Sequence, residues 1–424
     1  MTPVGRWLLA GLAAGFLTSW AIEAQGPGAG RGGGGGRGRG AAVALPEGAG
    51  REEVQAACAS CHGLNLITGA SGFSRAAWQD LVGTMVRLPD PEVRTVSDYL
   101  ATHFPEKPGR RPTLVSGPVT VTFKEWIVPT LGQRPRDPLQ LPDGTIWWAG
   151  MYADLVGRLN PATGEMREFP LAKGASPHSI INDASGNIWY TGNGNGTIGR
   201  LDPRSGEITV FPMPDPAARD PHTPVFDRAG TLWFTLQGSN MVGRLNPSAR
   251  DIRLIAMPTP NARPYGMIAS PEGVLWVAYN GANKIARIDP KTLDVREFTT
   301  PAAESRIRRL DMISDGTIYY GDSRGYLGRL DPKTGAFREW PSPSGPTSSP
   351  YALAVVNDIV WYNESGQRPD ALVRFDPRTE TFQSWAIPSG VGIIRHMRAT
   401  PEGNLVIHQS SSNRVGLVTI GKAK

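Results

Sequence analysis

The strongest constraint on the fold of this chain is a pattern that recurs seven times between residue 115 and the C-terminal end. Each copy has a short strand of the type Gly-x-Ile/Leu-Trp-aromatic, followed by a strand of the type Val-Gly-Arg-Leu-Asp. The arginine of the second strand falls at Arg158, Arg200, Arg244, Arg287, Arg329 and Arg374, with Leu417 in the seventh copy. Spacings of 42 to 45 residues are typical of four-stranded propeller blades. We therefore expect a mainly β, seven-bladed propeller over residues 115–422.

The two ends of the repeat array indicate how the ring closes. The seventh copy has only three strands and stops near Ile420, whereas a strand-like segment at residues 124–129 precedes the first copy. We predict that this segment completes the seventh blade, because pairing removes two open sheet edges. We interpret the repeated Gly-Arg-Leu-Asp motif as structural, packing one blade against the next.

The N-terminal region has the features of an export signal followed by a tether. Residues 1–25 have a basic start at Arg6, an apolar run over residues 7–21 and a small residue, Ala24, for cleavage, which predicts a signal peptide. An uncleaved membrane anchor is the alternative. Residues 26–48 are rich in glycine and arginine and predict a flexible linker. The net charge of +6 is too small for this length to indicate a nucleic-acid partner, so we expect a periplasmic or otherwise exported protein.

Both cysteines of the chain lie in one motif, Cys58-Ala59-Ser60-Cys61-His62. The C-x-x-C-H pattern attaches c-type haem: the two thiols bond the vinyl groups, and the histidine binds the iron. A redox-active dithiol is the alternative, and two cysteines exclude a disulfide scaffold. The motif therefore predicts one covalent haem c, held by Cys58 and Cys61 with His62 as an axial ligand.

The surroundings of this motif predict a small all-α domain. Helices are expected over residues 51–62, over residues 75–87 with Ser74 as the N-cap, and from Pro91, with Asp90 as the N-cap, to about residue 104. Residues 49–107 resemble the single-haem cytochrome c family, whose usual sixth iron ligand is methionine. That resemblance makes Met85 the candidate, since no other methionine lies between the signal and the propeller. His103 is the other candidate, and a vacant position is a third alternative.

The repeats resemble the virginiamycin B lyase (streptogramin lyase) family of seven-bladed propellers. The matching sequences are Asn261-Ala262-Arg263-Pro264-Tyr265, Gly281-Ala282-Asn283-Lys284-Ile285, and Pro221-His222 followed by Trp233-Phe234-Thr235. The resemblance implies that His222 acts as a base, that His178 contacts substrate, and that Asp220 binds Mg²⁺. The second acidic Mg²⁺ ligand of the family is replaced by Leu236. Because Mg²⁺ requires several oxygen ligands, this replacement argues against Mg²⁺ and lyase activity.

Aligning the repeats gives one position per blade at the start of the innermost strand, where seven side chains should gather around the channel mouth. These residues are Arg136, His178, His222, Tyr265, Arg308, Tyr351 and Arg395. Three cations, two imidazoles and two phenols suit a small anionic or polar ligand. The alternative is that they line a wet channel and pair with nearby acids.

These observations favour an exported haem protein with an electron-transfer cytochrome domain and a propeller that binds substrate or a partner. The redox partner is expected to be a protein or a small-molecule electron donor or acceptor. One alternative is a C–O lyase that opens an ester-linked cyclic peptide of the streptogramin B type. A second alternative is a non-catalytic binding propeller. We expect a monomer with no nucleic-acid partner.

Overall fold

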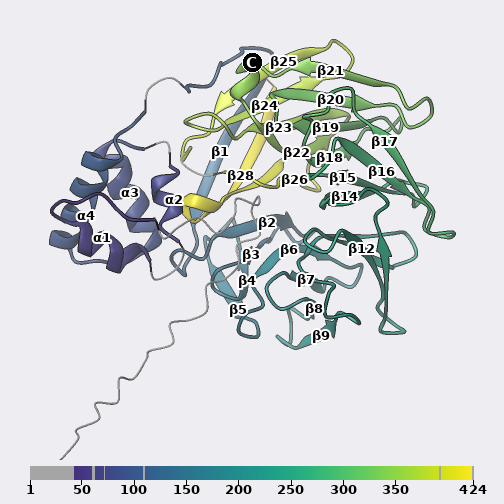
Figure 1. The fold of residues 1–424 in the computed structure, drawn as a ribbon, viewed down its shortest axis with the longest axis horizontal. Coiled ribbons are helices and arrows are strands. Elements are labelled where there is room, and N and C mark those ends of the chain that lie inside the picture. Colours follow the sequence, from purple (N-terminus) through teal and green to yellow (C-terminus); the bar gives the residue numbers. More distant parts are fainter. Residues whose placement is uncertain (1–42, 60–62, 71, 108–109, 391–392, 423–424) are drawn as a thin grey trace, which may run out of the picture.

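The computed structural model describes residues 43–422 except residues 60–62, 71, 108–109 and 391–392 (Figure 1). The predicted signal peptide and residues 26–42 of the predicted linker lie outside this part of the chain, as do Cys61 and His62. Within the described residues, no helix is long and apolar enough to span a membrane.

Four short helices form a helical unit, residues 43–107, at one side of the molecule (Figure 1). They are α1 (Arg51–Cys58), α2 (Asn65–Thr68), α3 (Arg75–Met85) and α4 (Asp90–His103). Ser74 caps α3 as predicted, because its Oγ accepts a hydrogen bond from the Ala77 N–H at 3.3 Å. The predicted start of α4 was one residue late, since Pro89 is its N-cap and Asp90 is already helical. The predicted end of α3 at residue 87 was two residues late. The first helix was predicted over residues 51–62, but α1 ends at Cys58 with Ala59 as its C-cap. The short α2 was not predicted, because four residues are too few for a periodicity to be seen in sequence.

The helical unit has its own apolar core. Its buried members come from α1, α2, α3, α4 and the segments between them: Leu45, Val54, Ile67, Phe73, Trp78, Val82, Val96, Tyr99 and Leu100. The indole N–H of Trp78 donates to the backbone oxygen of Phe104 at 3.0 Å, which ties α3 to the end of α4. Gly50 precedes α1 with φ of +93°, and a Cβ there would lie 2.9 Å from Tyr99 Cβ, so glycine allows α1 to approach α4.

The remaining described residues form seven four-stranded antiparallel sheets, which confirms the predicted propeller. Blades 1 to 3 consist of β2 (Pro135–Gln140), β3 (Ile146–Gly150), β4 (Leu155–Leu159), β5 (Met166–Pro170); β6 (Pro177–Asn182), β7 (Ile188–Gly192), β8 (Thr197–Leu201), β9 (Ile208–Pro212); and β10 (Pro221–Phe226), β11 (Leu232–Leu236), β12 (Met241–Asn246), β13 (Asp251–Ala256). In each of these blades the strands pair in chain order, from the innermost to the outermost.

Blades 4 to 6 repeat the same order. They consist of β14 (Pro264–Ala269), β15 (Leu275–Tyr279), β16 (Lys284–Ile288), β17 (Val295–Thr299); β18 (Ile307–Met312), β19 (Ile318–Asp322), β20 (Tyr326–Leu330), β21 (Phe337–Pro341); and β22 (Pro350–Val356), β23 (Ile359–Glu364), β24 (Ala371–Asp376), β25 (Thr381–Ala386). A short 3₁₀ turn, η1 (Gly345–Thr347), precedes blade 6. The innermost strands β2, β6, β10, β14, β18 and β22 each carry a register shift after their first residues.

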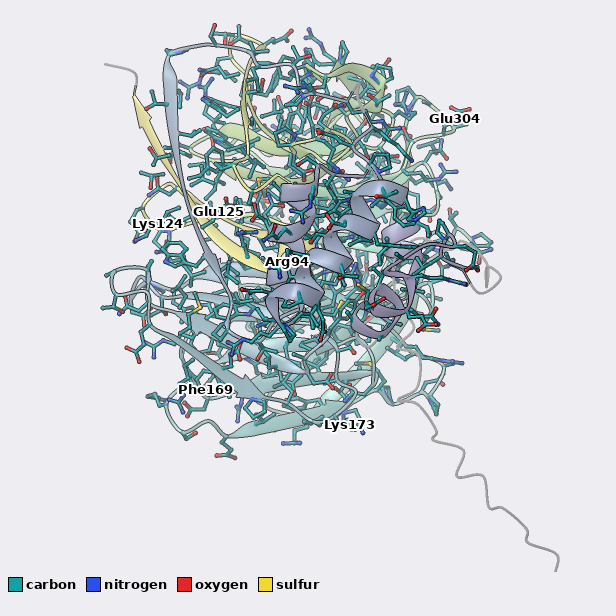
Figure 2. The ribbon with its side chains drawn as sticks, turned by 90° about the vertical axis from the view of Figure 1, so that its left-hand side faces the viewer. Arg94, Lys124, Glu125, Phe169, Lys173 and Glu304 are labelled. Carbon is teal, nitrogen blue, oxygen red and sulfur yellow. The ribbon has the colours of Figure 1, made fainter. Side chains whose placement is uncertain are left out.

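Blade 7 joins the two ends of the propeller, as the sequence predicted. It consists of β26 (Arg398–Ala399), β27 (Leu405–Gln409), η2 (Ser410–Ser412), β28 (Arg414–Lys422) and, from the N-terminal side, β1 (Val119–Ile127). β1 pairs antiparallel with β28 along its whole length, from Val119 opposite Lys422 to Ile127 opposite Arg414. The strand begins five residues before the predicted residue 124. Figure 2 shows Lys124 and Glu125 on β1 as it runs beside the yellow β28.

The repeated Gly-Arg-Leu-Asp motif packs both between and within blades. Its leucine lies in a core shared with the preceding blade, as Leu201 does with Trp147 and Phe169 of blade 1, so the predicted packing between blades is confirmed for that residue. Its arginine packs within its own blade. Arg158 lies opposite Trp147 on the adjacent strand, and its guanidinium carbon is 5.9 Å from the centroid of the indole ring. The glycine is needed on the other face, because a Cβ on Gly157 would lie 2.0 Å from the Trp148 ring. The same holds in blades 2, 3 and 5, where the glycine of the motif makes room for the aromatic ring on the adjacent strand.

The helical unit docks against the propeller where blades 7 and 1 meet. The N–H of Gly132, just before β2, donates to the backbone oxygen of Thr84 in α3 at 3.2 Å, and α3 also contacts η2. The linker then runs along blade 6, where the Ser384 N–H donates to the Val115 oxygen at 2.9 Å. Figure 2 faces this side of the molecule, with Arg94 of α4 in front of the propeller.

Candidate functional site

A cavity lies between the helical unit and the propeller, and both units line it. The helical side is largely apolar: Ala57, Cys58, Asn65, Leu66, Ile67, Gly69, Ala70, Phe73, Trp78, Leu81, Val82, Met85, Val86 and Leu100. Cys58 is the last residue of α1 and Met85 the last of α3, so the ends of two helices bring the two sulfur-bearing side chains to one cavity. Leu66 lines it although its side chain is 48% exposed, which marks an apolar surface suited to a flat apolar ligand.

The structure places the two residues predicted as candidate sixth ligands, Met85 and His103, in different surroundings. Met85 lines the cavity, whereas the residues around the cavity in the described part of the chain do not include His103. The His103 ring lies 4.4 Å from the ring of Tyr99, on the side of α4 that faces Gly48. Residues 60–62 lie outside the described residues, so the positions predicted for Cys61 and His62 stay predictions.

The propeller side of the cavity is polar. Its residues are Gly132, Arg134, Tyr152, Arg368, Ile393, Arg395, Ser410 and Ser411. Arg134 donates to the Tyr152 hydroxyl and lies over its ring, 4.8 Å from the centroid. Arg368 pairs with Asp370 at 3.3 Å. The cavity is therefore apolar at one wall and cationic at the other.

The seven residues predicted at the channel mouth do come together there. Arg136, His178, His222, Tyr265, Arg308 and Tyr351 are each second in their innermost strands, and Arg395 lies just before β26. Their side chains form a nearly continuous series of contacts. Arg136 contacts His178 Nε2; the ring centroids of His178 and His222 are 3.6 Å apart; those of His222 and Tyr265 are 4.0 Å apart; the hydroxyls of Tyr265 and Tyr351 are 2.5 Å apart; and Arg308 lies 4.6 Å over the Tyr351 ring.

Burial sets the protonation of this ring. It lowers the pKa of both His178 and His222 well below the ordinary value, and Arg136 near His178 and Arg309 near His222 act in the same direction. Both imidazoles are therefore neutral at pH 7. Burial opposes ionisation of Tyr351 as well, but Arg308, Arg395 and Arg136 outweigh it and bring the pKa of that phenol to about 8.

A buried ion-pair cluster beneath the ring was missed by the sequence reasoning. Asp137 is 0% exposed; its Oδ2 lies 3.0 Å from Arg309 Nη2 and 3.1 Å from His396 Nδ1, and it accepts a hydrogen bond from the Ser179 hydroxyl. Arg309 comes from blade 5 and Asp137 from blade 1, so the pair spans the channel. The sequence signal that could have identified this cluster is a charged residue directly after the ring position in β2 and in β18.

The residues proposed for Mg²⁺ do not fit that ion. Asp220 accepts a hydrogen bond from the Asn193 amide, and burial raises its pKa to about 6. Leu236 is 0% exposed in an apolar cluster with Trp189 and Phe211, so no second carboxylate stands there. In the described part of the chain, no group of three or more His, Cys, Asp or Glu side chains is arranged to hold a metal ion.

The fold is a seven-bladed propeller, and sequence comparison shows the family to which it belongs. The Virginiamycin B lyase family matches residues 117–288 and 250–423, and the chain belongs to this family. A search of curated proteins gave no significant match.

Solved structures support the propeller fold. Virginiamycin B lyase from Staphylococcus aureus is 20% identical, with a TM-score of 0.65 over 71% of this chain and 99% of that one. A streptogramin B lyase is 22% identical, with the same TM-score over 71% and 98%. Hydrazine synthase from Kuenenia stuttgartiensis is 14% identical, with a TM-score of 0.57 over 68% and 96%. At these identities the likeness shows the fold alone.

Proposed function

We propose that the chain is an exported c-type haem protein in which residues 49–107 are a single-haem cytochrome c domain and the propeller is a binding or docking platform. The observation that carries the proposal is the cavity lined by Cys58 and Met85 and walled by apolar side chains. A haem bound there supplies reversible one-electron transfer at its iron. The partner is a redox protein or a small-molecule electron donor or acceptor.

The residues of the helical unit fit such a group. Cys58 and Cys61 would hold it through thioether bonds, and His62 would be the first axial ligand. Met85 is favoured over His103 as the second axial ligand, because Met85 lines the cavity and His103 packs on Tyr99. Trp78 and Val82, which are 3% and 5% exposed, would exclude water from one wall. The export proposal rests on residues 1–25, whose pattern is that of a signal peptide.

Covalent haem attachment tests the proposal directly. The full chain, produced in a bacterial host that matures c-type cytochromes, should carry one haem that stays with the polypeptide after denaturation. Cys61→Ala should reduce attachment severely, whereas the matched control Ser60→Ala, inside the same motif, should not. A colourless full-length protein from such a host would contradict the proposal.

A streptogramin-type lyase is the second candidate, favoured by the family match and by the adjacent His178 and His222 rings. In that reaction the neutral His222 imidazole would take the proton beside an ester, and elimination would open the cyclic peptide without water. Leu236 at the second acidic position weighs against it. We expect little or no Mg²⁺-dependent opening of a streptogramin B ester by the purified protein. Robust opening that is lost in His222→Ala would reverse this ranking.

A further inference from the structure

Three arginines gather at the propeller mouth where blades 7 and 1 meet. Arg134 and Arg136 lie at the start of blade 1, and Arg395 lies just before the innermost strand of blade 7. In the part of the chain that the structure describes, none of the three forms an ion pair with a carboxylate. Arg136, which is 1% exposed, contacts only His178 and the Met151 sulfur through its polar atoms, and Arg134 contacts the Tyr152 hydroxyl.

Each of these guanidinium groups disfavours the charged form of its neighbours. Burial, followed by the charges of Arg395 and Arg136, lowers the pKa of Arg134 to about 9. Burial and Arg136 likewise lower the pKa of Arg395. Two buried nitrogens, Arg136 Nε and Arg395 Nη1, have no hydrogen-bond partner in the described structure. Arg136 is buried, and Arg134 and Arg395 are half-buried. Because an anion that accepted hydrogen bonds from the unused donors would offset the cost of burying these charges, the cluster indicates a site for a bound anion.

The position of the cluster indicates which anion. Arg134 and Arg395 line the same cavity as Cys58 and Met85. They belong to the cationic propeller wall, whereas the helical wall is apolar. The helical unit is held over this wall by the hydrogen bond from Gly132 to Thr84 at 3.2 Å. A haem attached at Cys58 has an apolar macrocycle and two carboxylates at one edge, which matches an apolar wall facing a cationic one. Arginine is suited to bidentate carboxylate binding.

We infer that Arg134 and Arg395 bind carboxylates at the propeller mouth, and that the two propionates of the haem are the carboxylates they bind. This inference rests on the proposed haem attachment. The propeller would thereby form part of the haem site, and the positive charge of its arginines would raise the reduction potential of the iron. A free carboxylate ligand has the same chemistry, and the experiment below separates the two sources.

The experiment uses the full-length haem-bearing protein with Arg134→Gln and Arg395→Gln. Resonance Raman spectroscopy reports the bending mode of the haem propionates, which responds to their hydrogen bonds. The inference predicts that this band shifts in both variants and that the reduction potential falls in both. The matched control is Arg200→Gln, which removes the same charge from blade 2, where Arg200 lies 5.9 Å over Trp189. The control should move neither readout.

Thermal stability supplies a second readout, for which the haem-free protein is Cys61→Ala. With the site empty, Arg395→Gln should raise the melting temperature because it relieves repulsion, whereas in the haem-bearing protein it should lower it. Succinate should stabilise the haem-free protein in an Arg395-dependent way and should not stabilise the haem-bearing protein. An unchanged propionate band would overturn the inference, as would Arg395-dependent stabilisation of the haem-bearing protein by succinate. If the wild-type chain carries no haem, the proposed function itself fails, and that result is visible before any variant is measured.

Discussion

Closure of the ring by β1 can be tested by removing the strand. Nine residues of β1 pair with β28, and Val121 and Phe123 pack against the core shared by blades 6 and 7. At about 0.2–1 kcal/mol per cross-strand pair, the strand contributes about 2–9 kcal/mol. This is a large part of the roughly 5–15 kcal/mol that separates a folded domain from its unfolded chain. A chain that begins at Thr130 should therefore be strongly destabilised.

The comparison needs a chain that lacks the helical unit but keeps β1. A chain beginning at Pro112 meets this requirement and should remain folded, with a urea midpoint well above that of the chain beginning at Thr130. Far-UV circular dichroism is the appropriate probe, because the shorter chain also lacks Trp126. The exposed β28 edge should make the shorter chain aggregate, which light scattering would detect.

Point variants test the same reasoning without truncation. Phe123→Ala removes a half-buried ring from the core and should cost about 2 kcal/mol, whereas the exposed neighbour Thr122→Ala should cost less than about 0.5 kcal/mol. Equal urea midpoints for the two truncated chains, together with a neutral Phe123→Ala, would refute the view that β1 stabilises the ring.

Four further variants test the cavity and the position of the family's second acidic ligand. Absorption spectra of the oxidised protein should show a weak red band from methionine bound to the haem iron. Met85→Ala should abolish this band and His103→Ala should retain it. The reverse pattern would identify His103 as the ligand. Gly132 has φ of +66°, and a Cβ there would lie 3.1 Å from the Met85 backbone oxygen. Gly132→Ala should therefore weaken the docking of the helical unit on the propeller by about 1 kcal/mol, which limited proteolysis would measure. Leu236→Glu buries a carboxylate in an apolar cluster and should destabilise the propeller by about 3 kcal/mol. If Mg²⁺ partly restores the urea midpoint of this variant, then Asp220 and the new glutamate can bind one ion together.

The propeller was predictable because its signal is repeated. A single Gly-x-Leu-Trp strand would be ambiguous, but seven copies at a constant period define both the blade count and the missing strand. The extent of β1 was underestimated because residues 119–123 precede the repeat. Half-buried and exposed residues alternate along this segment, and the alternating Val-Thr-Val-Thr-Phe sequence was a strand signal that the prediction did not use. The start of α4 and the end of α3 were misjudged by one and two residues because capping depends on backbone angles, such as ψ of 148° at Pro89, which sequence specifies poorly.

The channel mouth was predictable residue by residue, and the cavity above it was not. Alignment of the repeats placed His178, His222 and Tyr265 at equivalent positions, and equivalent positions in a ring converge. Arg134 stands at a repeated position, two residues before the ring residue, where Asp220 and Arg263 stand in blades 3 and 4. The importance of Arg134 and Tyr152 depends on how the helical unit docks on the propeller. Nothing in the local sequence specifies that docking, which a backbone hydrogen bond at Gly132 and the packing of α3 on η2 define.

Access to the ring bears on the choice between a lyase and a haem platform. His178 and His222 are 1% and 0% exposed, and the cavity that leads toward the mouth is walled on one side by the helical unit. A cyclic peptide that reached His222 from this side would have to displace that unit, whereas a haem already held by it would not. If the helical unit closes the mouth, diethyl pyrocarbonate should modify His222 faster in the chain beginning at Pro112 than in the full-length protein. Peptide mass spectrometry would measure both rates. Equal rates of His222 modification would mean that the helical unit leaves the mouth open, and the argument that favours a haem platform over a lyase would lose its structural basis.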